Sequence, residues 1–207
     1  MLIYKPVFSI FLSVYLLAMA AAQQKPAESD KFLFKKIKTR LTVAEKKHLF
    51  QQLSIKWSKN KERFIDNDDI NEVTPYTAVN FFSVDINKDG VEEVFIVLIN
   101  PALFEKTGVQ IILFSKDQDG SYQKNTEIPA EDMVPLSRKH LGYPDMLLSS
   151  SDTEFIIWRW NGKRYKFFQK VTGPQLPDGP NKGLGEISKA YQGSLKNWQL
   201  PSFSDTC

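Results

Sequence analysis

The sequence predicts an α+β fold in which an N-terminal helix or helices pack on an antiparallel sheet of about six or seven strands. Helical periodicity is confined to the first third of the 207-residue chain, and short apolar runs separated by turn residues fill the middle. A chain of this length with 15 Phe and 4 Trp can bury the core of one compact domain, which we expect to span residues 32–207.

Residues 1–22 have the pattern of a secretory signal peptide. Lys5 precedes an apolar stretch from Val7 to Leu17, and small residues follow up to Ala22. The apolar stretch is shorter than the roughly 20 residues that a spanning helix needs. We therefore expect cleavage, export to the periplasm or the medium, and no transmembrane span in the mature chain. The alternative is an uncleaved anchor. Residues 23–31 form a polar leader.

Residues 32–65 form a basic segment for which the sequence predicts helix. From Lys31 to Arg63 there are eleven Lys or Arg and two acidic residues, whereas the net charge of the whole chain is +3. Thr42 and Glu45 have the spacing of a capping box. One helical face would carry the apolar residues Val43, Phe50, Leu53 and Trp57. The basic excess indicates either a surface for an anionic partner or a solvated helix face.

Residues 76–171 predict the sheet, because apolar runs alternate with turn signals. The expected strands are Ala78–Val84, Glu93–Ile99, Val109–Ser115, Tyr122–Glu127, Met146–Leu148, Glu154–Trp160 and Arg164–Val171. Asn161-Gly162 between the last two is a strong hairpin signal. The tail, residues 172–207, is rich in Pro and Gly, and we expect in it one short helix from Ile187 to Trp198.

The loop between the first two strands carries the chemistry of the chain. The loop is the first part of the stretch VDINKDGVEEVFIVLIN, residues 84–100, and the predicted strand is the second part. Asp85, Asn87 and Asp89 stand at alternate positions, and Gly90 follows for a sharp turn, as in a calcium-binding loop. Carboxylates this close repel one another without a cation. The sequence therefore favours a calcium site over a plain polar turn. The shorter KDQDGS stretch lacks the third oxygen and predicts only a turn.

The residues after the glycine separate this loop from an EF-hand. Ile96 stands where an EF-hand has its bidentate Glu, and a strand follows where an EF-hand has a helix. The loop instead resembles that of FG-GAP or VCBS repeats, in which D-x-N-x-D-G-x-x-D/E joins two strands of a propeller blade. The chain is too short for a closed propeller, and is similar to small exported bacterial proteins with one such loop. The resemblance implies a structural calcium ion with the ligands Asp85, Asn87, Asp89, Val91 (through its carbonyl) and Glu93, where Glu replaces the usual Asp.

Motifs of the common enzyme classes are absent from the sequence: there is no G-x-S-x-G, P-loop, G-x-G-x-x-G or H-E-x-x-H. His48 and His140 have no neighbour at metal-ligand spacing, and Cys207 has no second cysteine with which to form an internal disulfide. Glu92 and Glu93 are consecutive in a predicted strand, so they should point to opposite faces of the sheet rather than act as a pair.

An aromatic group surrounds the last predicted hairpin and would form either core or a stacking platform for sugars or bases. Its members are Trp158, Trp160, Tyr165, Phe167 and Phe168. Together these observations predict an exported, non-enzymatic, calcium-binding domain that binds a protein or an anionic glycan of the bacterial envelope, with no specific nucleic acid as partner. A secreted hydrolase of unrecognised type and a purely structural envelope component are the alternatives. The sequence gives no signal for the oligomeric state.

Overall fold

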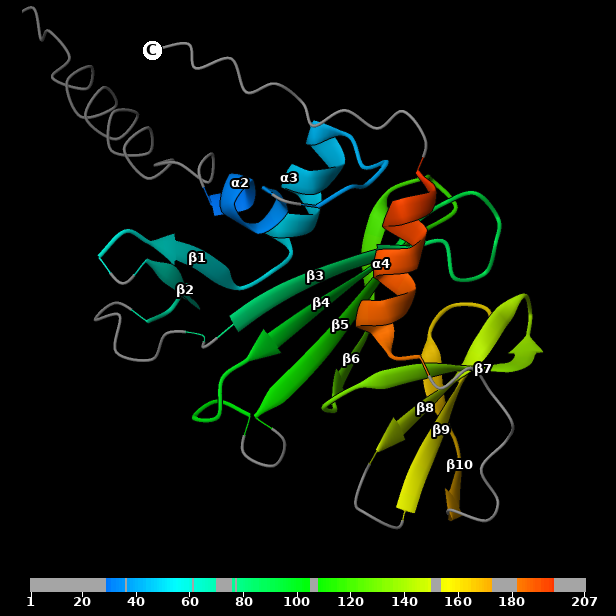
Figure 1. The fold of residues 1–207 in the computed structure, drawn as a ribbon. Coiled ribbons are helices and arrows are strands. Elements are labelled where there is room, and N and C mark those ends of the chain that lie inside the picture. The colour runs from blue at the N-terminus through cyan, green and yellow to red at the C-terminus, as the bar shows by residue number, and fades with distance from the viewer. Residues whose placement is uncertain are drawn as a thin grey trace, which may run out of the picture.

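The structure is a computed structural model. It describes residues 29–35, 37–60, 62–69, 76, 78–104, 108–149, 154–172 and 182–195. Over these ranges the chain forms ten strands in three antiparallel sheets and three helices (Figure 1). The predicted signal peptide, most of the polar leader and Cys207 lie outside the described residues. Within the described ranges, no helix combines the length and the apolar character needed to span a bilayer.

The predicted α+β class is wrong, because the described chain is mostly β and its strands do not form one sheet. Helices are few and short: α2 (Ser29–Phe34), α3 (Val43–Gln51) and α4 (Leu184–Ser194). Residues 52–65, predicted as helix, instead contain β1 (Ile55–Ser58) and most of β2 (Arg63–Asp66), which pair as a small sheet. Ile and aromatic side chains in both segments favour strand over helix.

The central sheet has four strands in the order of the chain, and they closely match the predicted ones. They are β3 (Ala78–Val84), β4 (Glu93–Ile99), β5 (Val109–Lys116) and β6 (Tyr122–Pro129). β4 is buried on both faces over all but its last residue, as its unbroken apolar run predicts. The loop with the calcium pattern joins β3 to β4.

A second four-stranded sheet follows, and it does not continue the first. It contains β7 (Met133–His140), β8 (Tyr143–Ser149), β9 (Glu154–Trp160) and β10 (Tyr165–Thr172), in the order β10-β9-β8-β7. β7 was not predicted, because it contains Pro135 and its second half is polar, and neither feature is typical of a strand. Pro has no backbone N–H and is tolerated in an edge strand such as this one. The prediction of a single sheet of six or seven strands therefore fails at the turn between β6 and β7.

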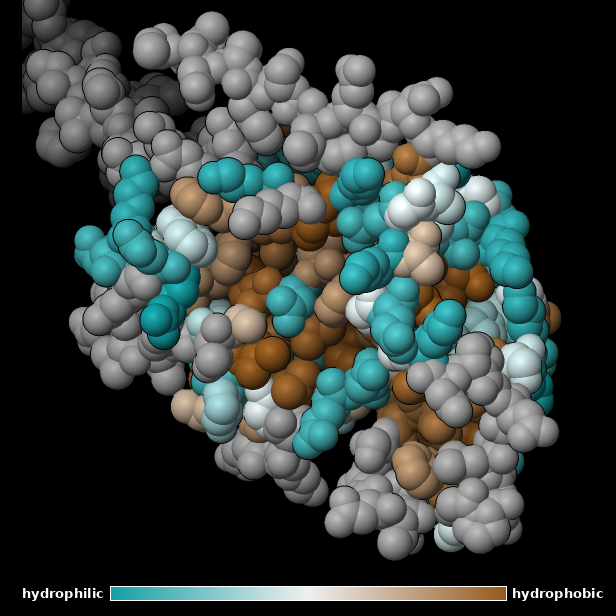
Figure 2. All heavy atoms as spheres, viewed as in Figure 1, coloured by the Kyte–Doolittle hydropathy of each residue, from teal (hydrophilic) through white to brown (hydrophobic). Residues whose placement is uncertain are grey.

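Two apolar cores lie on opposite faces of the central sheet. Ile96 of β4 belongs to the core shared with α2, α3 and β1–β2, and the adjacent Phe95 belongs to the core shared with the second sheet and α4. Both side chains have 0% of their surface exposed. In Figure 2, further apolar residues gather over the middle of one face, between α2 and α4. The central sheet is therefore a middle layer, and its loops can contact both neighbouring layers.

In the N-terminal segment, the predicted capping box is present, but the predicted apolar face of the helix is not. Thr42 and Glu45 form the capping box, with Thr42 N donating to Glu45 Oε2 at 2.7 Å and Glu45 N donating to Thr42 Oγ1 at 3.2 Å. Phe50 and Leu53 are buried, but Val43 is 74% exposed. Since the helix ends at Gln51, a stripe drawn through Trp57 does not exist.

Candidate metal centre and binding cleft

The loop between β3 and β4 is curled by hydrogen bonds from its own backbone. Asp85 accepts from the backbone N–H of Asp89 at 3.0 Å and of Gly90 at 2.9 Å through its two carboxylate oxygens. Asn87 Oδ1 also accepts from Asp89 N at 3.0 Å, and Asp89 Oδ1 accepts from Val91 N at 2.8 Å. The three side chains at alternate positions therefore turn toward the same short stretch of backbone.

Two residues with positive φ make this curl possible. Lys88 has a φ of 70° and Gly90 a φ of 91°. A Cβ placed on Gly90 would meet nothing within 4 Å, so glycine is needed here for its backbone conformation and not for space. The sequence pattern predicted this turn correctly.

Glu93, the last predicted ligand, is buried at the junction with the second sheet. It is 2% exposed; its Oε2 accepts from Ile86 N at 3.0 Å and its Oε1 accepts from the Tyr143 hydroxyl of β8 at 2.8 Å. Burial raises the pKa of Glu93 to about 7; the hydrogen bonds oppose this shift, and the negative charges of Asp89 and Asp85 add to it. The loop is thus joined to the second sheet through one carboxylate.

Glu92 points the other way, which confirms the prediction from strand alternation. Its carboxylate accepts from the Thr39 hydroxyl and from Arg40 N at 2.8 Å, both in the N-terminal layer. Its backbone carbonyl accepts from the Tyr122 hydroxyl at 2.8 Å. The two consecutive carboxylates therefore serve different layers and do not form a catalytic pair.

The oxygens of the loop fit a hard cation in kind and in order. Asp85, Asn87, Asp89 and Glu93 offer side-chain oxygens within nine residues, and Val91 offers a carbonyl. Each carboxylate oxygen has more than one lone pair, so accepting an N–H does not exhaust it. Within the described residues, no three His, Cys, Asp or Glu side chains are already gathered as a metal site. Ion binding would therefore require these side chains to move closer together.

The KDQDGS turn between β5 and β6 is the closest internal comparison. Asp117 Oδ1 accepts from Asp119 N and from Ser121 N, both at 3.0 Å, and Gly120 has a φ of 78°. The same type of curl forms there with fewer oxygens, as predicted for a plain turn.

The two histidines contact backbone carbonyl oxygens. His48 Nε2 lies 3.0 Å from the oxygen of Tyr122, and His140 Nδ1 lies 2.9 Å from that of Trp160. These contacts place each ring between two elements of the fold and explain its position without a metal.

The aromatic group of the last hairpin divides between core and surface. Trp160 and Tyr165 are buried, 6% and 1% exposed, and Trp160 stacks on Tyr143 with ring centroids 4.2 Å apart. Phe167 and Phe168 are 58% and 39% exposed. The core interpretation therefore holds for the first pair, and the platform interpretation stays open for the exposed residues.

An open cleft of about 390 Å³ lies between β6 and the β9–β10 hairpin. Six of its lining residues are Asn125, Thr126, Glu127, Trp158, Arg164 and Phe167. At its base Thr126 Oγ1 accepts from Tyr165 N at 3.1 Å, which ties the edge strands of the two sheets together. A second hollow of similar volume beside α2 and β3 is lined mainly by apolar side chains.

Sequence reasoning missed a buried carboxylate in the second sheet. Asp145 of β8 is fully buried and accepts from Arg159 Nε and Nη2, both at 2.9 Å, and from Arg138 Nε. Burial alone would raise the pKa of Asp145, but hydrogen bonds from both arginines hold it below its usual value. The Arg159 guanidinium lies 3.4 Å from the Phe168 ring centroid. Asp145 and its two arginine partners lie on three different strands, and the strand pairing brings them together.

No family model matches the chain, and the comparisons with curated proteins and with solved structures give no match either.

Proposed function

We propose that this chain is an exported, non-enzymatic binding domain of the bacterial envelope or the extracellular space, braced by one calcium ion in the loop from Asp85 to Glu93. One observation carries the proposal: the loop curls its oxygen-bearing side chains at the point where the central sheet meets the second sheet. A cation bound there would tie the two sheets together, which is a structural role.

Electrostatics favours a cation at this position. Asp85, Asp89 and Glu93 bring three carboxylates into one short loop, and the raised pKa of Glu93 expresses the cost of ionising the buried one. A divalent ion would offset that cost and favour the ionised carboxylate. Because the ion would bind the folded chain and not the unfolded one, it would raise the free energy of unfolding.

The resemblance to FG-GAP and VCBS loops supports calcium over other metals, and so does the all-oxygen donor set. Glu93 has one methylene more than the usual Asp, so it can reach the ion from a buried strand position. The signal-peptide pattern of residues 1–22 supports export.

Calorimetric titration of calcium into the chelator-treated mature chain tests the proposal. Asp89→Asn keeps an oxygen that can accept from Val91 N but removes one negative charge from the loop. Asp119→Asn makes the same change in the comparison turn and serves as the matched control. We expect one equivalent of calcium to bind the parent and the control and a higher melting temperature for both with calcium.

The Asp89→Asn variant should lose most of the heat and of the thermal shift. The calcium proposal would be refuted by a parent chain that gives neither heat nor thermal shift. Equal binding by the two variants would also refute it, because the ion would then bind elsewhere.

A further inference from the structure

The cleft between β6 and the β9–β10 hairpin combines an aromatic wall with polar side chains. Phe167 of β10 pairs with Trp158 of β9 in the strand register, so the two side chains project from the same face of the sheet. Phe167 is 58% exposed and both residues line the cleft. An exposed aromatic side chain next to a second one gives a flat apolar wall of the kind that stacks on a ring.

The opposite wall is polar. Asn125, Thr126 and Glu127 come from successive positions of β6. Glu127 pairs with Lys124 at 3.1 Å and is 40% exposed, so it remains accessible to a ligand in the cleft. Neighbouring residues of a strand alternate between its two faces. The Thr126 hydroxyl therefore lies at the base of the cleft, where it accepts from Tyr165 N, and the Asn125 amide and the Glu127 carboxylate flank it along the edge strand. These groups offer both donors and acceptors, which suits a ligand rich in hydroxyl groups.

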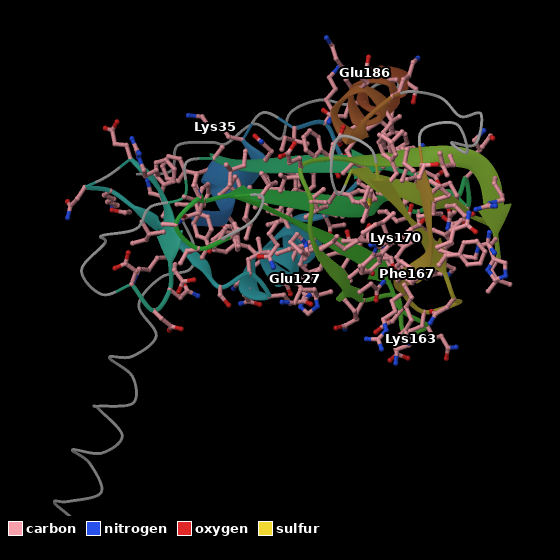
Figure 3. The ribbon with its side chains drawn as sticks, turned by 90° about the horizontal axis from the view of Figure 1, so that it is seen from below. Lys35, Glu127, Lys163, Phe167, Lys170 and Glu186 are labelled. Atoms are coloured by element: carbon pink, nitrogen blue, oxygen red, sulfur yellow. The ribbon has the colours of Figure 1, made fainter. Side chains whose placement is uncertain are left out.

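The hairpin is cationic. From Glu154 to Thr172 it carries five Lys or Arg and one acidic residue. One of the five, Arg159, is paired with Asp145 on the other face of the sheet and adds no charge to the cleft. Arg164 lines the cleft, and Figure 3 shows Lys163, Phe167 and Lys170 on the same hairpin, with Glu127 of β6 on its inner side. A ligand that enters the cleft therefore meets a positive potential beside the aromatic wall.

We infer that this cleft binds an acidic sugar, a uronic acid unit of an anionic polysaccharide. The C–H face of the pyranose ring would stack on Phe167 and Trp158, because the face of an aromatic ring is electron-rich. Its carboxylate would pair with Arg164, whose planar guanidinium fits a carboxylate. Its hydroxyl groups would bond to Asn125 and Glu127. The inference names the partner of the binding role proposed above, and it does not require calcium.

Charge and stacking together favour an acidic sugar over a nucleic acid. A single strand of nucleic acid is bound by successive exposed aromatic faces along a groove. Here the next aromatic residue, Phe168, does not line the cleft. Its ring is covered by the Arg159 guanidinium at 3.4 Å, and Arg159 alternates with Trp158 along β9, so Phe168 lies on the other face of the sheet. Among the aromatic residues that line the cleft, Tyr165 is only 1% exposed, so Phe167 and Trp158 offer one place to stack and not a series.

The test uses Trp fluorescence and calorimetry with galacturonate, mannuronate and glucuronate oligosaccharides as probes. Methyl-esterified oligogalacturonate of the same length is the uncharged control, and polyglutamate is the control for an acidic polymer without sugar rings. Phe167→Ala and Arg164→Gln are the cleft variants. Phe168→Ala is the matched aromatic control, and Lys47→Gln in α3 represents the N-terminal basic segment.

We expect saturable binding of at least one uronate series, weakened about tenfold by Phe167→Ala and about tenfold or more by Arg164→Gln. Phe168→Ala and Lys47→Gln should bind like the parent. Absence of binding across all three series would overturn the inference. It would equally fail if the methyl ester or polyglutamate bound as tightly as the uronate, or if only Lys47→Gln reduced binding.

Each measurement is made both in chelator and in calcium. Uronate binding that persists in chelator, in a chain that takes up no calcium, would support the cleft and refute the metal site. Calcium uptake without uronate binding would do the opposite. The two proposals can therefore fail separately.

Discussion

Tyr143→Phe tests the hydrogen bond that joins the candidate metal loop to the second sheet. The Tyr143 hydroxyl donates to Glu93 Oε1 at 2.8 Å, and Glu93 is 2% exposed, so the variant leaves a buried carboxyl oxygen without this donor. A hydrogen bond to a charged group contributes about 1.5–3 kcal/mol, and one between neutral groups about 1 kcal/mol. The loss therefore depends on whether Glu93 is ionised.

The pKa of Glu93, raised to about 7 by burial, determines how the size of this loss depends on pH. Near pH 5 the carboxyl group is protonated, and near pH 8 it is ionised. We expect Tyr143→Phe to lower the free energy of unfolding by about 1 kcal/mol near pH 5 and by about 2–3 kcal/mol near pH 8. Urea unfolding in chelator, followed by circular dichroism, measures both values.

The parent chain carries its own pH dependence from the same group. Since folded Glu93 holds its proton more tightly than unfolded Glu93, stability falls as pH rises from 4.5, the ordinary pKa of a Glu side chain, to about 7 and is level above that. The total contribution of the shift is about 3 kcal/mol. Glu93→Gln should remove this slope.

Tyr165→Phe is the matched control, because its hydroxyl donates at 2.8 Å to a neutral acceptor, the carbonyl of Pro144. Its loss should be about 1 kcal/mol at both pH values. If Tyr143→Phe cost the same near pH 5 and near pH 8, the ionised Glu93 would not depend on this bond, and the link between loop and sheet would have to be abandoned.

Three further predictions concern the fold. Asp145→Asn removes the charge shared by two arginines and should lower the free energy of unfolding by about 2–3 kcal/mol near neutral pH. The pKa of Asp145 is lowered in the folded chain, so this loss should disappear as acid protonates the carboxyl group of the parent. Urea unfolding over a range of pH measures it. Thr42→Ala breaks the capping box and should lower the free energy of unfolding by about 1 kcal/mol, measured by thermal unfolding. A variant as stable as the parent would rule out a stabilising cap. Phe95 is 0% exposed, and Phe95→Ala should lower the free energy of unfolding by about 3–5 kcal/mol. Val43 is 74% exposed, and Val43→Ala should stay within about 0.5 kcal/mol of the parent. Similar losses for the two variants would contradict the placement of the core.

Local signals in the sequence were sufficient for seven strands between residues 78 and 172 and for the curl of the loop, but not for β1, β2 or β7. Glu93–Ile99 and Glu154–Trp160 are bounded by turn residues and are strands with the predicted limits. The helix predicted through residues 52–65 failed because a few apolar residues at mixed spacing fit either period. In the structure Trp57 pairs with Phe64 across two neighbouring strands, and this pairing favours strand over helix.

The arrangement of the strands into sheets could not be predicted from local signals in the sequence. Nothing in the sequence marks Pro129 as the end of a sheet, and Tyr143 and Glu93 are 50 positions apart. Asp145 shows the same limit, since its arginine partners come from the neighbouring strands β7 and β9. The order of the oxygen-bearing side chains in the loop can be predicted from sequence, but the layers that they contact cannot.

Glu92 and Glu93 show why this position matters for any partner of the loop. One carboxylate is bonded to Arg40 N in the N-terminal layer and the other to Tyr143 in the second sheet, and a single peptide bond separates the two residues. A rotation of this peptide would change both contacts, so an ion that draws the backbone of Glu93 toward Asp85 and Asp89 would also alter the bond of Glu92. A calcium ion in the loop would therefore bear on the packing of all three layers, while the uronate cleft, at the opposite edge of the central sheet on β6, would be affected only through the position of the second sheet.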